Sequence, residues 1–138
     1  MVHLIKLSVG IRDVDHLRAA QRERALSDPP LRHRTRHGPK RREEILDGGS
    51  IYWVIAGMVQ ARQRVLDIES APYEDGSAAT AFVLDPNLVL VEPRPTKPFQ
   101  GWRYLNRNDA PQDLGEPGEA GADLPPGLRL ALRELCLL

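Results

Sequence analysis

Apolar and polar residues alternate in several short stretches of the chain, and one longer stretch has helical spacing. Residues 4–9 alternate between two faces and predict a first strand, which Gly10 ends. Asp13 is a suitable N-cap for a helix that continues to about Leu26, and Pro29-Pro30 stops that helix. The first thirty residues therefore predict a strand followed by a helix.

The most apolar segment is residues 50–57, Ser-Ile-Tyr-Trp-Val-Ile-Ala-Gly. Both of its faces are apolar, which is typical of a central strand or of one wall of a small barrel, and we expect Trp53 in the core. Residues 62–69 predict a second strand, and Asp75-Gly76 a hairpin tip. Residues 80–91 predict two further strands, with a bend at Asp85-Pro86-Asn87 between them.

The order of these elements is strand, helix, short helix at residues 40–46, several strands and a terminal helix. This order predicts the α+β class, with a small mixed or antiparallel sheet, or a partly open barrel, flanked by short helices. At 138 residues the chain is long enough to bury one core, so we expect residues 1–138 to form a single domain. Residues 115–126 predict a mobile, acidic loop rich in Gly and Pro, and residues 128–137 a C-terminal helix.

The charges are distributed unevenly although the formal net charge is zero. Residues 1–64 contain 13 Lys or Arg and 7 Asp or Glu, whereas residues 65–138 contain 6 and 12. The densest cluster is the basic segment, residues 32–42, with six Lys or Arg, two His and no acid. Two interpretations stay open: the segment binds an anionic partner, or it pairs with the acidic half of the same chain.

The chain has one cysteine, Cys136, so an internal disulfide is impossible. Residues 1–7 are not a basic leader followed by a long apolar stretch, so we do not expect them to be a secretion signal. The apolar run at 51–59 is too short to cross a bilayer. We therefore predict a cytoplasmic protein with no membrane partner. His33 and His37 have the spacing of helical metal ligands, but Gly38-Pro39 breaks a helix there, so we predict no metal site and no cofactor.

Two motifs carry a resemblance to a known family: Gly-Gly-Ser-Ile-Tyr-Trp at 48–53 and Phe-Gln-Gly-Trp-Arg-Tyr-Leu at 99–105. On these motifs the chain resembles a family of small bacterial proteins classed only as a domain of unknown function, which implies no activity. The fold is also similar, more weakly, to PUA-like barrels of the ASCH and EVE groups. That similarity implies a barrel that binds RNA or modified bases, although function does not follow from fold.

Basic residues attract phosphates and aromatic rings stack on bases, so basic clusters beside aromatic residues indicate recognition of single strands. We therefore predict an RNA- or nucleotide-binding module whose partner is RNA or a nucleotide-like ligand. The candidate residues combine cations from the basic segment with a pocket of arginines and aromatics. They are Arg34, Arg36, Arg41, Tyr52, Arg62, Arg64, Trp102, Arg103 and Tyr104.

Two other functions stay open. The protein could be a small hydrolase or transferase acting on a nucleotide-like or anionic substrate, with Asp67, Glu69 or Asp85 as general base. The plainer interpretation makes Asp85 a turn residue and the other two carboxylates partners of arginines. Alternatively, the basic segment belongs to a protein-interaction module that meets an acidic partner.

Overall fold

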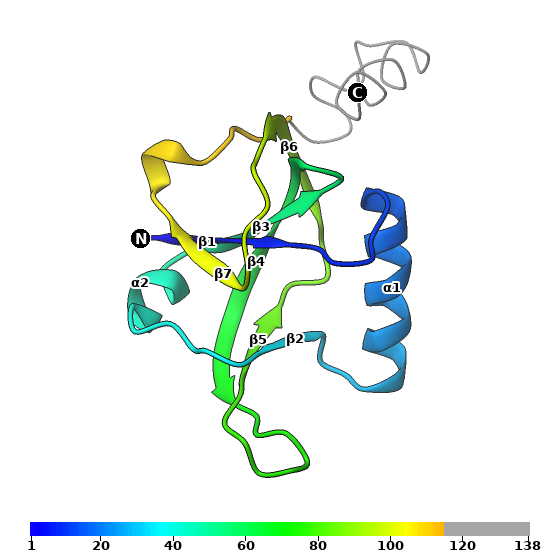
Figure 1. Ribbon diagram of the computed structural model, residues 1–138, viewed down its shortest axis with the longest axis vertical. Helices are drawn as coiled ribbons and strands as arrows, with labels where there is room; N and C mark the ends of the chain where they lie inside the picture. The colour runs from blue at the N-terminus through cyan, green and yellow to red at the C-terminus, as the bar shows by residue number, and fades with distance from the viewer. Residues whose placement is uncertain (115–138) are drawn as a thin grey trace.

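The computed structural model describes residues 1–114, which form a curled, mixed sheet of seven strands with two helices (Figure 1). The strands are β1 (His3–Leu7), β2 (Arg32–Thr35), β3 (Ser50–Ile55), β4 (Met58–Ser70), β5 (Thr80–Leu84), β6 (Val89–Pro95) and β7 (Trp102–Leu105). The helices are α1 (Val14–Ser27), α2 (Arg42–Leu46) and the 3-10 turn η1 (Arg107–Asp109). This arrangement confirms the α+β class and the partly open barrel. The predicted loop at 115–126 and helix at 128–137 lie outside the described residues.

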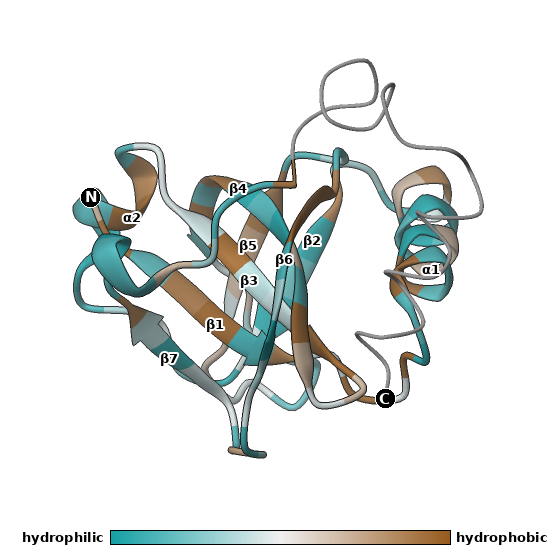
Figure 2. Ribbon diagram, turned by 90° about the horizontal axis from the view of Figure 1, so that it is seen from above, coloured by the Kyte–Doolittle hydropathy of each residue, from teal (hydrophilic) through white to brown (hydrophobic). Residues whose placement is uncertain are grey.

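The sheet has the strand order β2-β5-β4-β3-β1-β7, and β6 pairs with β4. β1 and β3 run parallel, whereas the other pairs are antiparallel. β4 is the longest strand and pairs with β3 and β6 along its first half and with β5 along its second. Register shifts occur along all three pairings of β4, and such irregularities bend a strand. Figure 2 shows the strands curling between α1 on one side and α2 on the other.

Helix α1 begins where the sequence predicts. The Asp13 carboxylate accepts a hydrogen bond from the His16 backbone N–H at 2.7 Å, which satisfies one of the free amides of the first turn. Val14, Leu17 and Gln21 form the buried face of the helix. The helix ends at Ser27, one residue after the predicted end.

Two elements differ from the prediction. The second strand begins at Met58 and not at residue 62, because Ala56 and Gly57 form a two-residue hairpin turn with φ of 53° and 79°. The apolar run at 51–59 concealed this turn, since Ala56 stands where Asn or Asp usually signals one. The first four residues of the basic segment form β2, which pairs with β5.

The sheet buries both of its faces. The inner face holds the main core, which includes Leu4, Ile51, Trp53 and Phe82. The outer face holds a smaller cluster of Tyr52, Val54, Val59 and Val91, covered by residues such as Phe99 and Leu105. Trp53 is 2% exposed, which confirms its predicted place in the core. All six residues of β3 are buried, as expected of a strand with two apolar faces.

Candidate functional site

The predicted arginines and aromatic residues do not form one pocket, because they lie on opposite faces of the sheet. Trp102 pairs with Lys6 in the β1–β7 register, and both Trp102 and Tyr104 pack against the inner core. Tyr52 lies in the outer cluster and pairs with Arg62 across β3 and β4. Arg103, between the two inner aromatics, points to the outer face, where its guanidinium lies 4.7 Å from the Phe99 ring centroid. The expectation of a single shared pocket was therefore wrong.

Trp102 and Tyr104, the two aromatic residues of β7, form hydrogen bonds with the backbone of the basic segment. The rings of Trp102 and Tyr104 lie on one face of β7 and meet edge to face at 5.0 Å. Trp102 Nε1–H donates to the His37 carbonyl at 2.6 Å. The Tyr104 hydroxyl oxygen accepts hydrogen bonds from the backbone N–H groups of Lys40 and Arg41, at 2.9 and 3.1 Å. These contacts hold the chain between β2 and α2 against the open edge of the sheet.

Three cations of the basic segment pair with carboxylates of the same chain. Arg32 lies 2.7 Å from Glu69, Arg41 lies 2.6 Å from Glu44, and Arg42 lies 3.0 Å from Asp67. The hydrogen bond from Arg41 lowers the pKa of the Glu44 carboxyl. Internal pairing therefore accounts for half of the cations in the segment.

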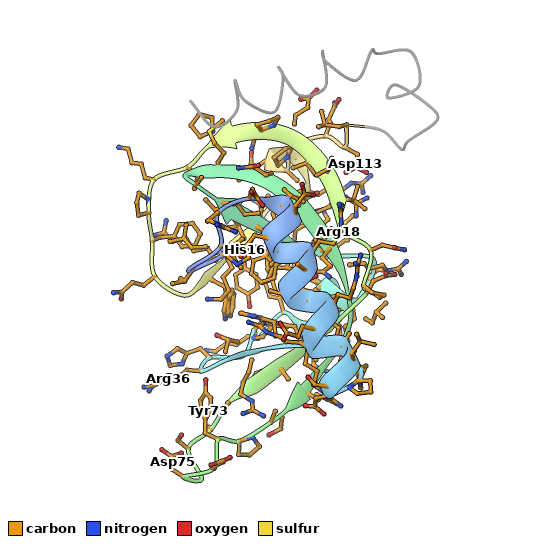
Figure 3. The ribbon with its side chains drawn as sticks, turned by 90° about the vertical axis from the view of Figure 1, so that its right-hand side faces the viewer. His16, Arg18, Arg36, Tyr73, Asp75 and Asp113 are labelled. Carbon is orange, nitrogen blue, oxygen red and sulfur yellow. The ribbon has the colours of Figure 1, made fainter. Side chains whose placement is uncertain are left out.

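The other three cations, Arg34, Arg36 and Lys40, are exposed and have no acidic partner within residues 1–114. The Arg34 guanidinium lies 5.3 Å from the Tyr73 ring centroid, a cation–π contact. In Figure 3, Arg36 projects outward at the same end of the molecule as Tyr73, and Asp113 lies toward the opposite end. We call these three residues the unpaired cations.

The three candidate general bases have structural roles. Asp67 and Glu69 form the ion pairs with Arg42 and Arg32. Asp85 Oδ1 accepts a hydrogen bond from the Asn87 backbone N–H at 2.9 Å, which is the contact of a turn. This confirms the plainer interpretation of Asp85 and gives the hydrolase or transferase hypothesis no support from these carboxylates.

Tyr52 and Arg62 line a shallow depression of about 360 Å³ on the outer face, together with His3, Gly48, Arg107 and Asp113. The Arg62 guanidinium donates to both Asp113 carboxylate oxygens at 2.7 Å and to Ser50 Oγ at 3.0 Å. This fork lowers the pKa of the Asp113 carboxyl, chiefly through the hydrogen bonds. We call this region the outer depression. Of the nine predicted residues, only Tyr52 and Arg62 line it.

His3 is a residue of this region that the sequence did not indicate. Its Nδ1 accepts a hydrogen bond from the Ser50 backbone N–H at 2.9 Å, and its ring meets Tyr52 edge to face at 5.0 Å. Burial lowers the pKa of His3, and the positive charge of Arg62 lowers it further. The parallel pairing of β1 with β3 brings His3 to Ser50, and no local pattern around residue 3 reveals that pairing.

The match to a family model covers residues 4–138, almost the whole chain. The chain belongs to the DUF1489 family of proteins of unknown function. This confirms the resemblance to a domain-of-unknown-function family and supplies no activity. The chain matches no curated protein and no solved structure. The similarity to PUA-like barrels therefore stays a prediction.

The inner face of this DUF1489 protein contains a closed set of polar contacts centred on Gln63. Its amide exchanges two hydrogen bonds with the Gln21 amide, each 2.8 Å long. The same amide donates to the Asp85 carbonyl at 2.8 Å and accepts from Trp53 Nε1–H at 3.1 Å. All four hydrogen-bonding positions of the amide are used, which is the arrangement expected of a structural core amide.

His33, on β2, lies on the same inner face, but one of its ring nitrogens lacks a hydrogen-bond partner among residues 1–114. Its ring meets Trp53 edge to face at 5.1 Å, and its Nε2 is buried with no hydrogen-bond partner among residues 1–114. Burial lowers the pKa of His33 to about 4, and the charges of Lys6 and Arg24 act in the same direction. The ring is therefore neutral at pH 7.

Within residues 1–114, no group of three or more His, Cys, Asp or Glu side chains is placed to hold a metal ion. None of the helices in that range is long and apolar enough to cross a membrane.

Proposed function

We propose that this DUF1489 protein binds single-stranded RNA through the unpaired cations of its basic segment. The observation that carries the proposal is the division within that segment. Three of its six cations pair with carboxylates, whereas Arg34, Arg36 and Lys40 stay exposed without an acidic partner in residues 1–114.

Exposed cations held on one short segment suit a phosphate backbone. An RNA strand that neutralises them releases its condensed counterions, and that release drives binding. Tyr73 lies beneath Arg34, so an aromatic ring and a guanidinium plane occur together at this end of the molecule. Bases stack on both kinds of surface, which favours a single strand over a duplex.

The anchoring contacts support the same proposal. Tyr104 and Trp102 bind backbone groups of residues 37, 40 and 41, so they leave the side chains of Arg36 and Lys40 free to meet a ligand. In this proposal the two inner aromatics position the cations and do not themselves stack on bases. Their predicted contribution to binding is therefore indirect.

The test is a titration of a fluorescently labelled, single-stranded RNA, followed by anisotropy at several salt concentrations. The wild-type affinity should fall steeply as salt rises. The triple variant R34E/R36E/K40E should lose binding at moderate salt, and the slope of log affinity against log salt should fall by about 2, since three single-strand phosphate contacts are removed.

The matched control is R12E/R22E/K97E, which reverses three exposed cations outside the basic segment and changes the net charge equally. This control should keep most of the affinity. Equal losses in the two triple variants would mean that only net charge matters, and that result contradicts the proposal. Absence of binding by the wild-type protein at low salt also contradicts it.

A further inference from the structure

The outer depression contains more hydrogen-bond donors than the described residues use. His3 Nδ1 accepts the Ser50 N–H, so the neutral ring carries its hydrogen on Nε2. Neither that N–H nor the Tyr52 hydroxyl has a hydrogen-bond partner within residues 1–114. Arg107 also lines the depression and forms no ion pair in the same range.

Among residues 1–114, Asp113 is the only carboxylate that lines the depression, and it forms an ion pair with the Arg62 guanidinium. The side chain of Asp113 is 41% exposed, so water reaches this ion pair from one side. Solvent screens the pair and limits its contribution to folding stability, and a second oxyanion on the same guanidinium fork would keep its hydrogen bonds. Another oxyanion can therefore replace the carboxylate at small cost to the fold.

We propose that the outer depression binds a phosphate monoester, which displaces Asp113 from Arg62. The two lining arginines outnumber the single carboxylate, so the depression favours an anion. A guanidinium fork matches phosphate oxygens as well as carboxylate oxygens. A carboxylate has only two oxygens, and the Arg62 fork binds both. His3, Tyr52 and Arg107 supply further hydrogen-bond donors, and the three terminal oxygens of a phosphate monoester can accept from them.

This site is independent of the proposed RNA surface. None of the unpaired cations lines the depression, and Figure 3 shows Arg36 and Asp113 toward different ends of the molecule. Failure of one proposal therefore leaves the other standing. The charge reversals at residues 34, 36 and 40 should leave phosphate binding unchanged.

The test is calorimetric titration of the full chain with inorganic phosphate, adenosine 5′-monophosphate and adenosine. The first two should bind saturably and adenosine should not. The variant D113N removes the competing charge and keeps the size of the side chain, so it should bind phosphate roughly fivefold more tightly. The variant R107A, at an exposed position, should bind roughly fivefold more weakly.

The matched control is D109N, which removes one negative charge from an exposed residue that does not line the depression. It should bind phosphate as the wild type does. Similar affinities for phosphate and for the nucleotide would show recognition of the phosphate group alone, whereas tighter binding of the nucleotide would show a nucleotide site. Both results support the proposal.

Three results would overturn the proposal: no saturable phosphate binding by the wild type or D113N, affinities that D113N and R107A leave unchanged, or binding of adenosine as tight as that of the nucleotide. Thermal melts followed by circular dichroism should show that both variants fold. If D113N does not fold, R107A and Y52F carry the test, and both should weaken phosphate binding.

Discussion

The inner and outer faces of the β3–β4 pair differ in how fully their polar side chains are hydrogen-bonded within the protein. On the inner face, the Gln63 amide fills all four of its hydrogen-bonding positions with protein partners. On the outer face, His3 Nε2 and the Tyr52 hydroxyl have no partner among residues 1–114. Satisfied polar groups in a core specify the fold, whereas spare donors beside a surface depression are available to a ligand. The presence or absence of protein partners therefore distinguishes a structural network from a candidate site, although the two lie on neighbouring residues of the same strands.

His33 is the exception on the inner face, because its Nε2 is buried without a partner in the described part of the chain. A buried polar atom of this kind costs stability. The contrast with Gln63 can therefore be tested by measuring stability, as well as by measuring binding.

The largest effect is expected for Q63L. This change leaves the Trp53 N–H, the Gln21 amide and the Asp85 carbonyl without their partner, and the free energy of unfolding should fall by about 4 kcal/mol. Urea denaturation measures this loss. The control Q60L removes a buried glutamine whose amide donates a hydrogen bond to the Ile55 carbonyl, and it should cost about 1 kcal/mol. Equal losses in the two variants would contradict the structural role of the network.

The next effect is a loss of stability in acid. The pKa of His33 is lowered to about 4 in the folded protein, whereas the ordinary pKa of histidine is 6.5, so the unfolded chain binds more protons between these values. The contribution of His33 should therefore be constant above pH 6.5, and it should lower stability by up to about 3 kcal/mol as the pH decreases to 4. Thermal or urea unfolding at several pH values measures the profile.

The variant H33F tests the source of this acid sensitivity. It removes the titrating ring and the buried unpartnered nitrogen, so its stability should change less between pH 6.5 and 4. A smaller slope should remain, because the pKa of His3 is also lowered in the folded state. The control H37F changes an exposed ring and should keep the wild-type profile. An unchanged slope in H33F contradicts the assignment.

The smallest effect is expected for Y52F. The Tyr52 hydroxyl has no hydrogen-bond partner within residues 1–114, whereas the ring packs in the outer cluster and stays in place. Removal of the oxygen should change the free energy of unfolding by no more than about 0.5 kcal/mol. A loss greater than about 1 kcal/mol would show that the hydroxyl stabilises the fold, which is the opposite of its expected role as a spare donor.

The sequence predicted elements whose signals are local. Asp13 marked the start of α1, and the proline at position 86 marked the bend between β5 and β6. The strand β2 was not predicted, because the high charge of residues 32–35 concealed an edge strand. The turn at residues 56 and 57 was also missed, because alanine occupies a position of positive φ.

The candidate sites were predicted only in part, since they depend on strand pairing. Tyr52 and Arg62 meet because β3 and β4 form a hairpin. Their residue types marked both as candidates, whereas the missed turn at residues 56 and 57 concealed their pairing. His3 reaches the same place through a parallel pairing, and Asp113 through an isolated bridge to Val91. Contacts between residues so distant in sequence leave no local signal.

The hydroxyl of Tyr104 has a consequence for the cost of ligand binding. It holds two successive backbone amides, those of Lys40 and Arg41, so this part of the basic segment is ordered before any ligand arrives. A free basic tail must lose backbone conformational entropy when it binds, whereas a segment fixed in this way loses mainly the rotamer freedom of its side chains. An aromatic residue that never contacts the ligand can in this way strengthen its binding.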